Sequence, residues 1–291
     1  MLGFPRTCST VLARILNQNP RIFVSNTSPT PYFIDTLHRK ATEWREMLAM
    51  EESLGDKAYI NFLYSGVKGW YETLTDKPIV ISKSKMWAAM FPHTFQFDAN
   101  SKYLFLVRDL RDIFCSYETQ VWRRPTLFEN HQETFENRVH MMTDVTKPDK
   151  LGPWLGRLPH VMETARKNPD KFMFIKQEDF VQHPKEHLDE IYDFLLEKNY
   201  EHDLDNIPDA PYYEHDSIYQ QPISHKVRKK LENIKPRYPD VLTKEQSEYF
   251  ITKFKWYYEL FYPEEVKQKT VVTLNEVGWN KNWTGGTQSS E

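Results

Sequence analysis

The first sixteen residues have the types and spacing of a phosphate-binding turn that leads into a helix. Gly3 and Pro5 shape the turn, and residues 7–10 (Thr-Cys-Ser-Thr) offer hydroxyl groups and free backbone N–H groups. Apolar residues then recur at helical spacing over residues 11–16. Because the first N–H groups of a helix have no intrahelical acceptor, an anion fits at this helix start. An ordinary N-capped helix is the alternative interpretation.

The turn differs from the Walker A loop, whose G-x-x-x-x-G-K-[ST] pattern places a lysine on the terminal phosphates and a hydroxyl on magnesium. Counted from Gly3, the second glycine position holds Cys8 and the lysine position holds Ser9. Arg6 supplies the positive charge instead. The turn can therefore still bind an anion, but it lacks the lysine with which a Walker A loop binds the terminal phosphates of a magnesium-bound triphosphate. This argues against a kinase or another P-loop phosphotransferase, which is the first alternative function.

A second pattern places an arginine at the end of a buried strand. Residues 102–107 (Lys-Tyr-Leu-Phe-Leu-Val) form a short apolar run that favours a parallel strand, and Arg108 follows it directly. Ser116 lies in the next helix, which we expect to begin near Ile113, where a side chain can point back toward the carboxyl edge of the sheet. One ligand can then contact Arg108 and Ser116. The alternative is a surface network of arginine and aspartate with an exposed helix serine.

Two lysines follow another short β-rich run, Pro78–Ser82. Lys83 comes directly after the run and Lys85 follows it closely, so each is a candidate cation at the carboxyl end of a strand. We favour Lys83. A solvated lysine at a strand end is the alternative interpretation.

Together these patterns resemble the sulfotransferases that use 3′-phosphoadenosine 5′-phosphosulfate (PAPS). The turn, written G-x-P-R-[ST]-x-[ST]-T, resembles their 5′-phosphosulfate loop, and Cys8 stands where that loop usually has glycine. Arg108 and Ser116 match the arginine and serine that bind the 3′-phosphate in the family. Lys83 resembles the lysine of tyrosylprotein and heparan-type sulfotransferases that contacts the oxygen bridging sulfate and phosphate.

The resemblance implies a reaction and the residues that perform it. A sulfuryl group would pass from PAPS to an acceptor hydroxyl or amine, adenosine 3′,5′-bisphosphate would be released, and no metal would be required. Arg6 and Lys83 would be the catalytic cations that stabilise charge on the leaving oxygen. The cofactor-binding residues that the resemblance implies are Arg6, Thr7, Cys8, Ser9, Thr10, Arg108, Ser116 and Lys230.

Two further segments extend the resemblance. Glu178-Asp179-Phe180 with Pro184 is similar to the Y-E-D-L-x-x-x-P segment of the family, and we interpret it as packing. Residues 222–230 are a basic helical start in the region where tyrosylprotein sulfotransferases place another cofactor-binding lysine, and Lys230 fits that spacing best. A solvated basic helix face is the alternative for this segment.

The general base is unassigned. Tyrosylprotein sulfotransferases carry a glutamate where this chain has Asn26 and Thr27, and cytosolic small-molecule sulfotransferases use a histidine, for which His93 is the nearest candidate by position. A non-catalytic nucleotide-binding protein with a decayed site is therefore the second alternative function. The segments over residues 17–20 and 25–29 are most similar to sulfotransferase-like proteins of bacteria and phages. This leaves the acceptor open among small molecules, carbohydrates and peptides.

Composition excludes several other classes of protein. The 291 residues carry 38 Lys and Arg against 41 Asp and Glu, a formal net charge of -3, so the total charge does not favour nucleic-acid binding. The sequence has no apolar run of membrane-spanning length and no secretory signal, so no membrane association is expected. Cys8 and Cys115, the two cysteines, argue against a disulfide scaffold and favour the reducing cytoplasm. No Cys/His cluster has zinc-ligand spacing.

The order of the expected elements indicates an α/β fold. Strand-like runs at residues 21–25, 78–82, 102–107 and 171–176 alternate with helical stretches, which predicts a central parallel sheet covered on both faces. Further helices are expected around residues 244–262. The resemblance implies the three-layer sandwich of the P-loop NTPase-like sulfotransferase fold.

We expect one domain over residues 1–283 and a disordered tail over residues 284–291. Helical insertions at about residues 32–75 and 120–165 are expected to form the substrate-side cap that holds the acceptor. The strand before Gly3 is expected to be short or truncated, at a cost in stability, because so few residues precede it.

Overall fold

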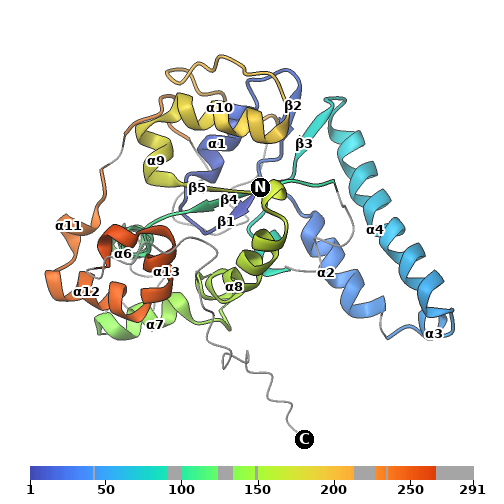
Figure 1. Cartoon of the computed structure of the whole chain (residues 1–291), viewed down its shortest axis with the longest axis horizontal. Helices are drawn as coiled ribbons and strands as arrows, with labels where there is room; N and C mark the ends of the chain where they lie inside the picture. The colour runs from blue at the N-terminus through green and yellow to red at the C-terminus, as the bar shows by residue number, and fades with distance from the viewer. Residues whose placement is uncertain are drawn as a thin grey trace, which may run out of the picture. The chain divides into compact units, whose positions relative to one another are not determined.

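The computed structural model describes residues 1–41, 43–90, 100–123, 134–147, 150–212, 227–233 and 235–266 (Figure 1). The chain divides into two compact units, Met1–Thr243 and Lys244–Glu291. In the second unit the described residues are 244–266. The tail expected over residues 284–291 lies outside the described residues, and the single domain expected over residues 1–283 stays a prediction.

Parallel strands form the centre of the first unit. Among the described residues they are β1 Leu2–Gly3, β2 Ile22–Val24, β3 Ile79–Ile81, β4 Tyr103–Val107 and β5 Phe172–Lys176. β1, β4 and β5 form one ladder, β2 and β3 form another, and every pairing is parallel. The four strand-like runs of the sequence are confirmed, and β1 is the short strand expected before the loop.

Two backbone hydrogen bonds connect the two ladders. The backbone nitrogen of Met1 donates to the carbonyl of Ser82 at 2.8 Å, and the backbone N–H of Ser84 donates to the carbonyl of Met1 at 3.2 Å. This is the slanted pattern of a parallel pair. The strands therefore run side by side in the order β2-β3-β1-β4-β5, with β1 and its following loop in the middle.

β4 is buried on both faces, as a central strand of a parallel sheet requires. Leu104 and Leu106 point into one apolar core. Phe105 points to the other face, where its ring centroid lies 5.8 Å from that of Phe4. The continuous apolar run that predicted this strand is thus explained by two cores rather than one.

Helices cover both faces of these strands and fill the connections between them. The described helices of the first unit are α1 Ser9–Leu16, α2 Thr30–Ala41, α3 Arg45–Leu48, α4 Glu52–Leu74, α5 Met86–Ala89, α6 Leu110–Arg123, α7 Phe135–Thr143, α8 Gly152–Lys167, α9 Gln177–Gln182, α10 Pro184–Leu195 and α11 Tyr238–Val241, with a 3-10 turn, η3, at Pro169–Lys171.

The two faces of the sheet are covered by different helices. α1 and α10 bury Leu12, Ile15, Leu188 and Ile191 against the core that holds Leu104, because each helix carries apolar residues three or four positions apart. α5 packs against β1 and α8. Figure 1 shows α8 on the opposite side of the strands from α9 and α10. The expected three-layer α/β arrangement is confirmed.

α6 begins at Leu110, a little before the start near Ile113 that the sequence indicates. The side chain of Asp109 accepts a hydrogen bond from the backbone N–H of Arg111 at 2.8 Å. An aspartate in this position caps a helix and satisfies one of its free N–H groups. The cap therefore starts α6 directly after Arg108, close to the end of β4.

The insertion expected over residues 32–75 is helical and consists of α2, α3 and α4. α4 buries one stripe that includes Leu63 and Tyr71. The hydroxyl oxygen of Tyr71 lies 2.7 Å from Oγ of Ser28 and 2.6 Å from Oγ of Ser82. These contacts fix the long helix to the segments that follow β2 and β3.

The second unit contains α12 Lys244–Lys253, α13 Lys255–Phe261 and a 3-10 turn, η5, at Pro263–Glu265. The helices expected around residues 244–262 are confirmed. Aromatic side chains hold the unit together: the ring centroid of Tyr257 lies 5.0 Å from that of Phe261. Within the described ranges, no helix has the length and apolar character needed to cross a bilayer.

Candidate anion-binding site

The loop between β1 and α1 depends on Gly3, whose φ is 148°. A Cβ atom at this position would lie 2.4 Å from the carbonyl oxygen of Leu106, so only glycine lets β1 approach β4 this closely. Beyond Gly3 the chain turns, and the hydroxyl of Thr7 donates to the carbonyl of Phe4 at 2.8 Å. The Thr7 side chain therefore closes the loop, and the backbone of the loop is held in place.

Arg6 and Cys8 both adopt left-handed backbone conformations, with φ angles of 65° and 57°. For residues other than glycine this conformation costs roughly 1–2 kcal/mol each. It explains why the related loop usually has glycine at the position of Cys8. Ser9 and Thr10 form the first turn of α1, which has no acidic residue. The N–H groups of this turn have no acceptor within the helix, and together with the helix dipole they favour an anion there.

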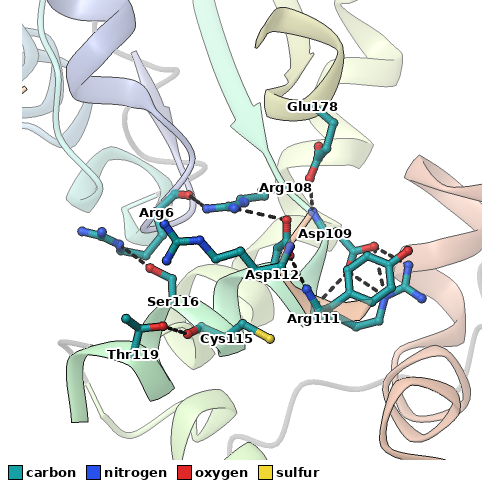
Figure 2. A network of polar contacts seen from close by, with 11 residues as sticks. Arg6, Arg108, Asp109, Arg111, Asp112, Cys115, Ser116, Thr119 and Glu178 are labelled. Carbon is teal, nitrogen blue, oxygen red and sulfur yellow. Dashed lines mark hydrogen bonds and ion pairs between the residues drawn. The ribbon is translucent and has the colours of Figure 1, made fainter. Parts of the chain in front are cut away.

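The two arginine patterns of the sequence meet in space. Nε of Arg6 donates to Oγ of Ser116 at 2.9 Å, and Nη1 of Arg108 donates to the backbone carbonyl of Arg6 at 2.8 Å (Figure 2). Parallel strands end at the same edge of a sheet, so the loop after β1 and the turn after β4 are neighbours. The structure brings Arg6 together with Arg108 and Ser116 at this edge.

Asp112 joins this cluster to a distant part of the chain. Its Oδ2 accepts a hydrogen bond from Nη2 of Arg108 at 3.1 Å. Its Oδ1 accepts the backbone N–H groups of Arg237 and Tyr238 at 2.8 and 3.1 Å. The ring of Tyr238 lies under the guanidinium of Arg111, 3.7 Å from its central carbon. The residues around 237 are therefore held against the start of α6.

Burial and neighbouring charges change the pKa of Arg6. Burial lowers the pKa of Arg6, and repulsion by Arg108 and Arg237 lowers it further, although Tyr117 opposes the shift. An arginine side chain remains charged in proteins despite such a shift. Several guanidinium groups therefore lie within electrostatic reach of one another, and a bound anion would relieve their repulsion.

Gln177, at the start of α9, faces the same loop. Its side chain forms a hydrogen bond with Cys8. Burial raises the pKa of the Cys8 thiol, and the positive charge of Arg108 opposes this shift. Gln177 is 3% exposed, and its Oε1 has no hydrogen-bond donor among the described residues. Leaving a buried amide oxygen unsatisfied costs about 1–3 kcal/mol, so this oxygen is available to a donor group of a ligand.

Lys83 is buried directly after β3, with 9% of its surface exposed. Its backbone N–H donates to Oγ of Ser25 and its carbonyl accepts the N–H of Ser28, each at 2.8 Å. Its Nζ donates to the backbone carbonyl of Asn26. Lys85 is exposed and lies over the ring of Trp154. Of the two lysines, Lys83 is the one held inside the fold, one strand away from the loop.

Lys230 is placed differently from the other expected cofactor-binding residues. Its side chain is 65% exposed and its Nζ lies 2.6 Å from a carboxylate oxygen of Asp205. The structure puts it in a surface ion pair rather than against Arg6 or Ser116. Residues 227–230 form no helix, so the helical start expected there is wrong for this part; residues 222–226 and His93 lie outside the described residues.

The segment interpreted as packing has a second role. Phe180 is buried in the core, as expected. Glu178, however, accepts the backbone N–H of Asp109 at 3.0 Å, and Gln177 faces Cys8. The sequence patterns give Gln177 no role. The sequence signal that could have identified it is its position directly before Glu178, in the segment similar to Y-E-D-L-x-x-x-P. Within the described ranges, no group of three or more His, Cys, Asp or Glu side chains could hold a metal ion.

Comparison with known proteins agrees with this geometry. A family model described as a sulfotransferase domain matches residues 1–254. The solved sulfotransferase domain from the curacin biosynthetic pathway is 14% identical, has a TM-score of 0.53, and is aligned over 87% of this chain and 95% of its own length. The solved sulfotransferase domain from the Synechococcus PCC 7002 olefin synthase is 14% identical, with a TM-score of 0.52, over 87% of this chain and 92% of its own.

At these identities the two solved structures support the fold alone. No match to the chain is found among curated proteins. The family model covers the loop, both arginine positions and all of the strands described above. This chain belongs to the sulfotransferase domain family.

Proposed function

We propose that this protein uses PAPS to transfer a sulfuryl group to an acceptor hydroxyl or amine. The observation that carries the proposal is the direct contact of Arg6 with Ser116 and Arg108. The resemblance assigns the loop to the 5′-phosphosulfate and assigns Arg108 and Ser116 to the 3′-phosphate. A nucleotide with a phosphate group on each of these ribose positions would contact all three residues.

The donor groups fit such a ligand. Arg6, Arg108 and the first-turn N–H groups of α1 offer hydrogen bonds and positive charge to phosphate oxygens. Gln177 adds the buried amide oxygen that could accept from a nucleotide N–H group. We therefore expect the loop to hold the 5′ end and Arg108 with Ser116 to hold the 3′-phosphate.

A P-loop phosphotransferase fits these groups less well. Ser9 occupies the position of its phosphate-binding lysine. The nearby carboxylates are engaged by the protein: Asp109 accepts from Arg111, and Asp112 accepts from Arg108. A magnesium nucleotide would have to compete with these buried ion pairs for its carboxylate ligands.

The residues of the chain can each be given a role in sulfuryl transfer. When bound, PAPS supplies the sulfuryl group and leaves as adenosine 3′,5′-bisphosphate. Arg6 and the loop N–H groups would stabilise negative charge on the leaving oxygen. Lys83 would also stabilise this charge, once its ammonium group donates to the ligand instead of to the Asn26 carbonyl. The base stays unassigned, and the acceptor class is a small molecule, a carbohydrate or a peptide.

The cytoplasm is the proposed place of the reaction. Cys8 and Cys115 are both free cysteines. A reducing compartment keeps such thiols reduced.

The test is the thermal stability of the purified protein with adenosine 3′,5′-bisphosphate, compared with ADP and with ATP plus magnesium. A ligand at a hundred times its Kd adds about 2.7 kcal/mol to the free energy of unfolding, which raises the melting temperature by roughly several degrees. We expect this increase with the bisphosphate alone. An increase only with ATP and magnesium would reject the proposal in favour of a phosphotransferase.

Binding alone does not distinguish an enzyme from a nucleotide-binding protein with a decayed site. The second measurement is therefore release of adenosine 3′,5′-bisphosphate from PAPS in the presence of phenols, sugars and tyrosine-containing peptides. Turnover with any of these acceptors supports the enzyme and names the acceptor class. Tight bisphosphate binding without turnover would favour the non-catalytic alternative.

A further inference from the structure

We propose that Tyr212 is a positioning residue of the proposed reaction, which acts on Lys83 through the loop after β2. The inference rests on the proposed function and adds a residue that the sequence patterns do not contain. It is carried by the hydrogen bonds that connect the Tyr212 hydroxyl, the peptide groups around Asn26 and the Lys83 ammonium group.

Residues 25–28, the loop after β2, surround Lys83. Oγ of Ser25 accepts the backbone N–H of Lys83, and the carbonyl of Lys83 accepts the backbone N–H of Ser28, each at 2.8 Å. Nζ of Lys83 donates to the backbone carbonyl of Asn26, between these two serines. The backbone contacts therefore fix where the side chain begins, and the Asn26 carbonyl fixes where its ammonium group lies.

One hydroxyl group holds the peptide groups on both sides of that carbonyl. The Asn26 carbonyl belongs to the peptide group between Asn26 and Thr27. The Tyr212 hydroxyl accepts the N–H of Asn26 at 3.1 Å, in the preceding peptide group, and donates to the carbonyl of Thr27 at 3.3 Å, in the following one. Because both neighbouring peptide groups are held, the carbonyl that receives the ammonium group is held as well.

The Tyr212 hydroxyl has a fixed position of its own. The ring of Tyr212 stacks on the ring of Phe23 at an interplanar angle of 25°, with the ring centroids 6.2 Å apart. Phe23 lies in β2 and is 4% exposed. The chain that leads to Tyr212 is anchored by Ile207, which is buried in the core that also holds Ile22 and Val24. A tyrosine has two side-chain torsions, so a stacked ring leaves its hydroxyl little freedom.

The position of the Lys83 ammonium group matters because its charge serves one leaving oxygen. We expect this group to exchange the Asn26 carbonyl for that oxygen during the reaction. A preorganised donor makes the exchange with little rearrangement, whereas a displacement of about 1 Å can lower a rate roughly 100-fold. Tyr212 keeps the start of this exchange in place.

Tyr71 is the competing candidate, because its hydroxyl approaches the same loop from α4. Its oxygen lies 2.7 Å from Oγ of Ser28 and 2.6 Å from Oγ of Ser82. Both contacts are with side chains, whereas Tyr212 contacts the peptide groups that flank the Asn26 carbonyl. The geometry therefore assigns the positioning of the ammonium group to Tyr212.

The first measurement is the chemical reactivity of Lys83, which requires neither substrate nor turnover. Amines of the whole protein are methylated with formaldehyde and a borohydride, and mass spectrometry compares Lys83 with the exposed Lys85 of the same molecule. Tyr212→Phe keeps the ring that stacks on Phe23 and removes the hydroxyl. We expect it to raise the rate at Lys83 relative to Lys85 by roughly 2–10-fold, the equivalent of one lost hydrogen bond.

Tyr192→Phe is the matched control. It removes a tyrosine hydroxyl that contacts Asn19 at 3.1 Å and His202 at 2.9 Å. Asn19 precedes β2, whereas the contacts of Tyr212 follow it. We expect Tyr192→Phe to leave the relative reactivity of Lys83 unchanged, and the melting temperatures of both variants check the fold.

The second measurement is turnover of PAPS with the best acceptor of the screen. We expect Tyr212→Phe to lower kcat by roughly tenfold and to leave the KM for PAPS and the bisphosphate affinity within about twofold, because the loop after β1 and Arg108 are unchanged. Added to Lys83→Met, the same substitution should cause no further loss, because Tyr212 acts through the ammonium group. Tyr192→Phe should keep full turnover.

The outcomes separate the two proposals. Unchanged reactivity of Lys83 in Tyr212→Phe, or an equal change in Tyr192→Phe, would reject the role of Tyr212 while the proposed function stands. An equal loss of turnover on the unmodified and Lys83→Met backgrounds would also reject it, because Tyr212 would then act by another route. If the unmodified protein neither binds the bisphosphate nor turns over PAPS, the proposed function itself fails, and the role of Tyr212 in the reaction fails with it.

Discussion

Arg6 and Ser116 are in direct contact, with Nε of the arginine donating to the serine hydroxyl at 2.9 Å. The two residues come from the loop after β1 and from α6. Their contact joins the two ends of the proposed PAPS-binding site, the loop for the 5′ end and Ser116 for the 3′-phosphate. An anion that binds between them would replace a hydrogen bond within the protein by hydrogen bonds to the ligand. The Ser116 hydroxyl is therefore a sensitive probe of the 3′-phosphate assignment.

Ser116→Ala is expected to weaken binding of adenosine 3′,5′-bisphosphate by roughly tenfold or more, because a hydroxyl that bonds to a charged phosphate is lost. Adenosine 5′-monophosphate should bind as before. Thr119→Ala is the matched control on the same helix, since the Thr119 hydroxyl donates to the carbonyl of Cys115 at 2.8 Å. Calorimetric titration measures both. A larger effect in Thr119→Ala than in Ser116→Ala would contradict the assignment.

Lys83→Met separates catalysis from binding. The variant keeps the apolar stem of the side chain and removes the ammonium group that we expect to stabilise the leaving oxygen. Turnover of PAPS should fall by roughly 10²–10³-fold, while bisphosphate affinity changes little. The measurement is bisphosphate release with the best acceptor of the screen, alongside calorimetry.

Lys85→Met is its control, because Lys85 is exposed and lies over Trp154. We expect it to keep full turnover. Under the alternative of a non-catalytic binding protein, neither lysine matters for function. Equal turnover of Lys83→Met and the unmodified enzyme would remove Lys83 from the catalytic residues.

Much of the fold could be predicted because its signals are local. β4 is a run of apolar residues with a charged residue at each end, and such a run reads as a buried strand without knowledge of the rest of the chain. The association of Arg6, Arg108 and Ser116 also follows from topology, since parallel strands end at a common edge. The expected start of α6 near Ile113 is too late, because the capping contact of Asp109 starts the helix at Leu110.

Arg237 and Lys230 show what the sequence could not decide. Both are basic residues in a segment without a periodic pattern, and spacing alone favours Lys230. Their places depend on tertiary contacts: Asp112 accepts the Arg237 backbone, whereas Asp205 pairs with Lys230. Neither carboxylate is near its partner in sequence, so a local pattern contains no information about where either basic residue is held.

Cys8 tests the backbone conformation of the loop. At φ 57° a glycine is free of the strain that any side chain carries, so Cys8→Gly should be more stable than Cys8→Ala by about 1 kcal/mol. Both variants lose the thiol, so the difference between them isolates the backbone. At Thr10, in the first turn of α1, the order should reverse, because glycine is less favourable in a helix than alanine, by up to about 1 kcal/mol in a helix interior. Denaturant unfolding of Cys8→Gly, Cys8→Ala, Thr10→Gly and Thr10→Ala measures both differences.

His202 makes the free energy of unfolding depend on pH. Its ring nitrogens contact the Tyr192 hydroxyl at 2.9 Å and the Gln18 side chain at 3.3 Å, and burial lowers its pKa from 6.5 to about 4. Between these values the unfolded chain binds a proton that the folded protein does not. Stability contributed by the neutral ring is therefore complete above pH 6.5 and falls as the pH drops toward 4.

Denaturant unfolding between pH 4 and 7 measures this slope, which we expect His202→Asn to reduce. The lost stability is at most about 3 kcal/mol, and less because the ring is partly exposed to solvent. The control is His187→Asn, which removes a histidine on α10 that contacts Glu190 at 2.9 Å near the surface. Comparison of the two slopes separates the effect of the buried His202 from that of a histidine near the surface. If His202→Asn kept the slope of the unmodified protein, the pH dependence would have to come from other groups, and the buried neutral form of His202 would be excluded as its cause.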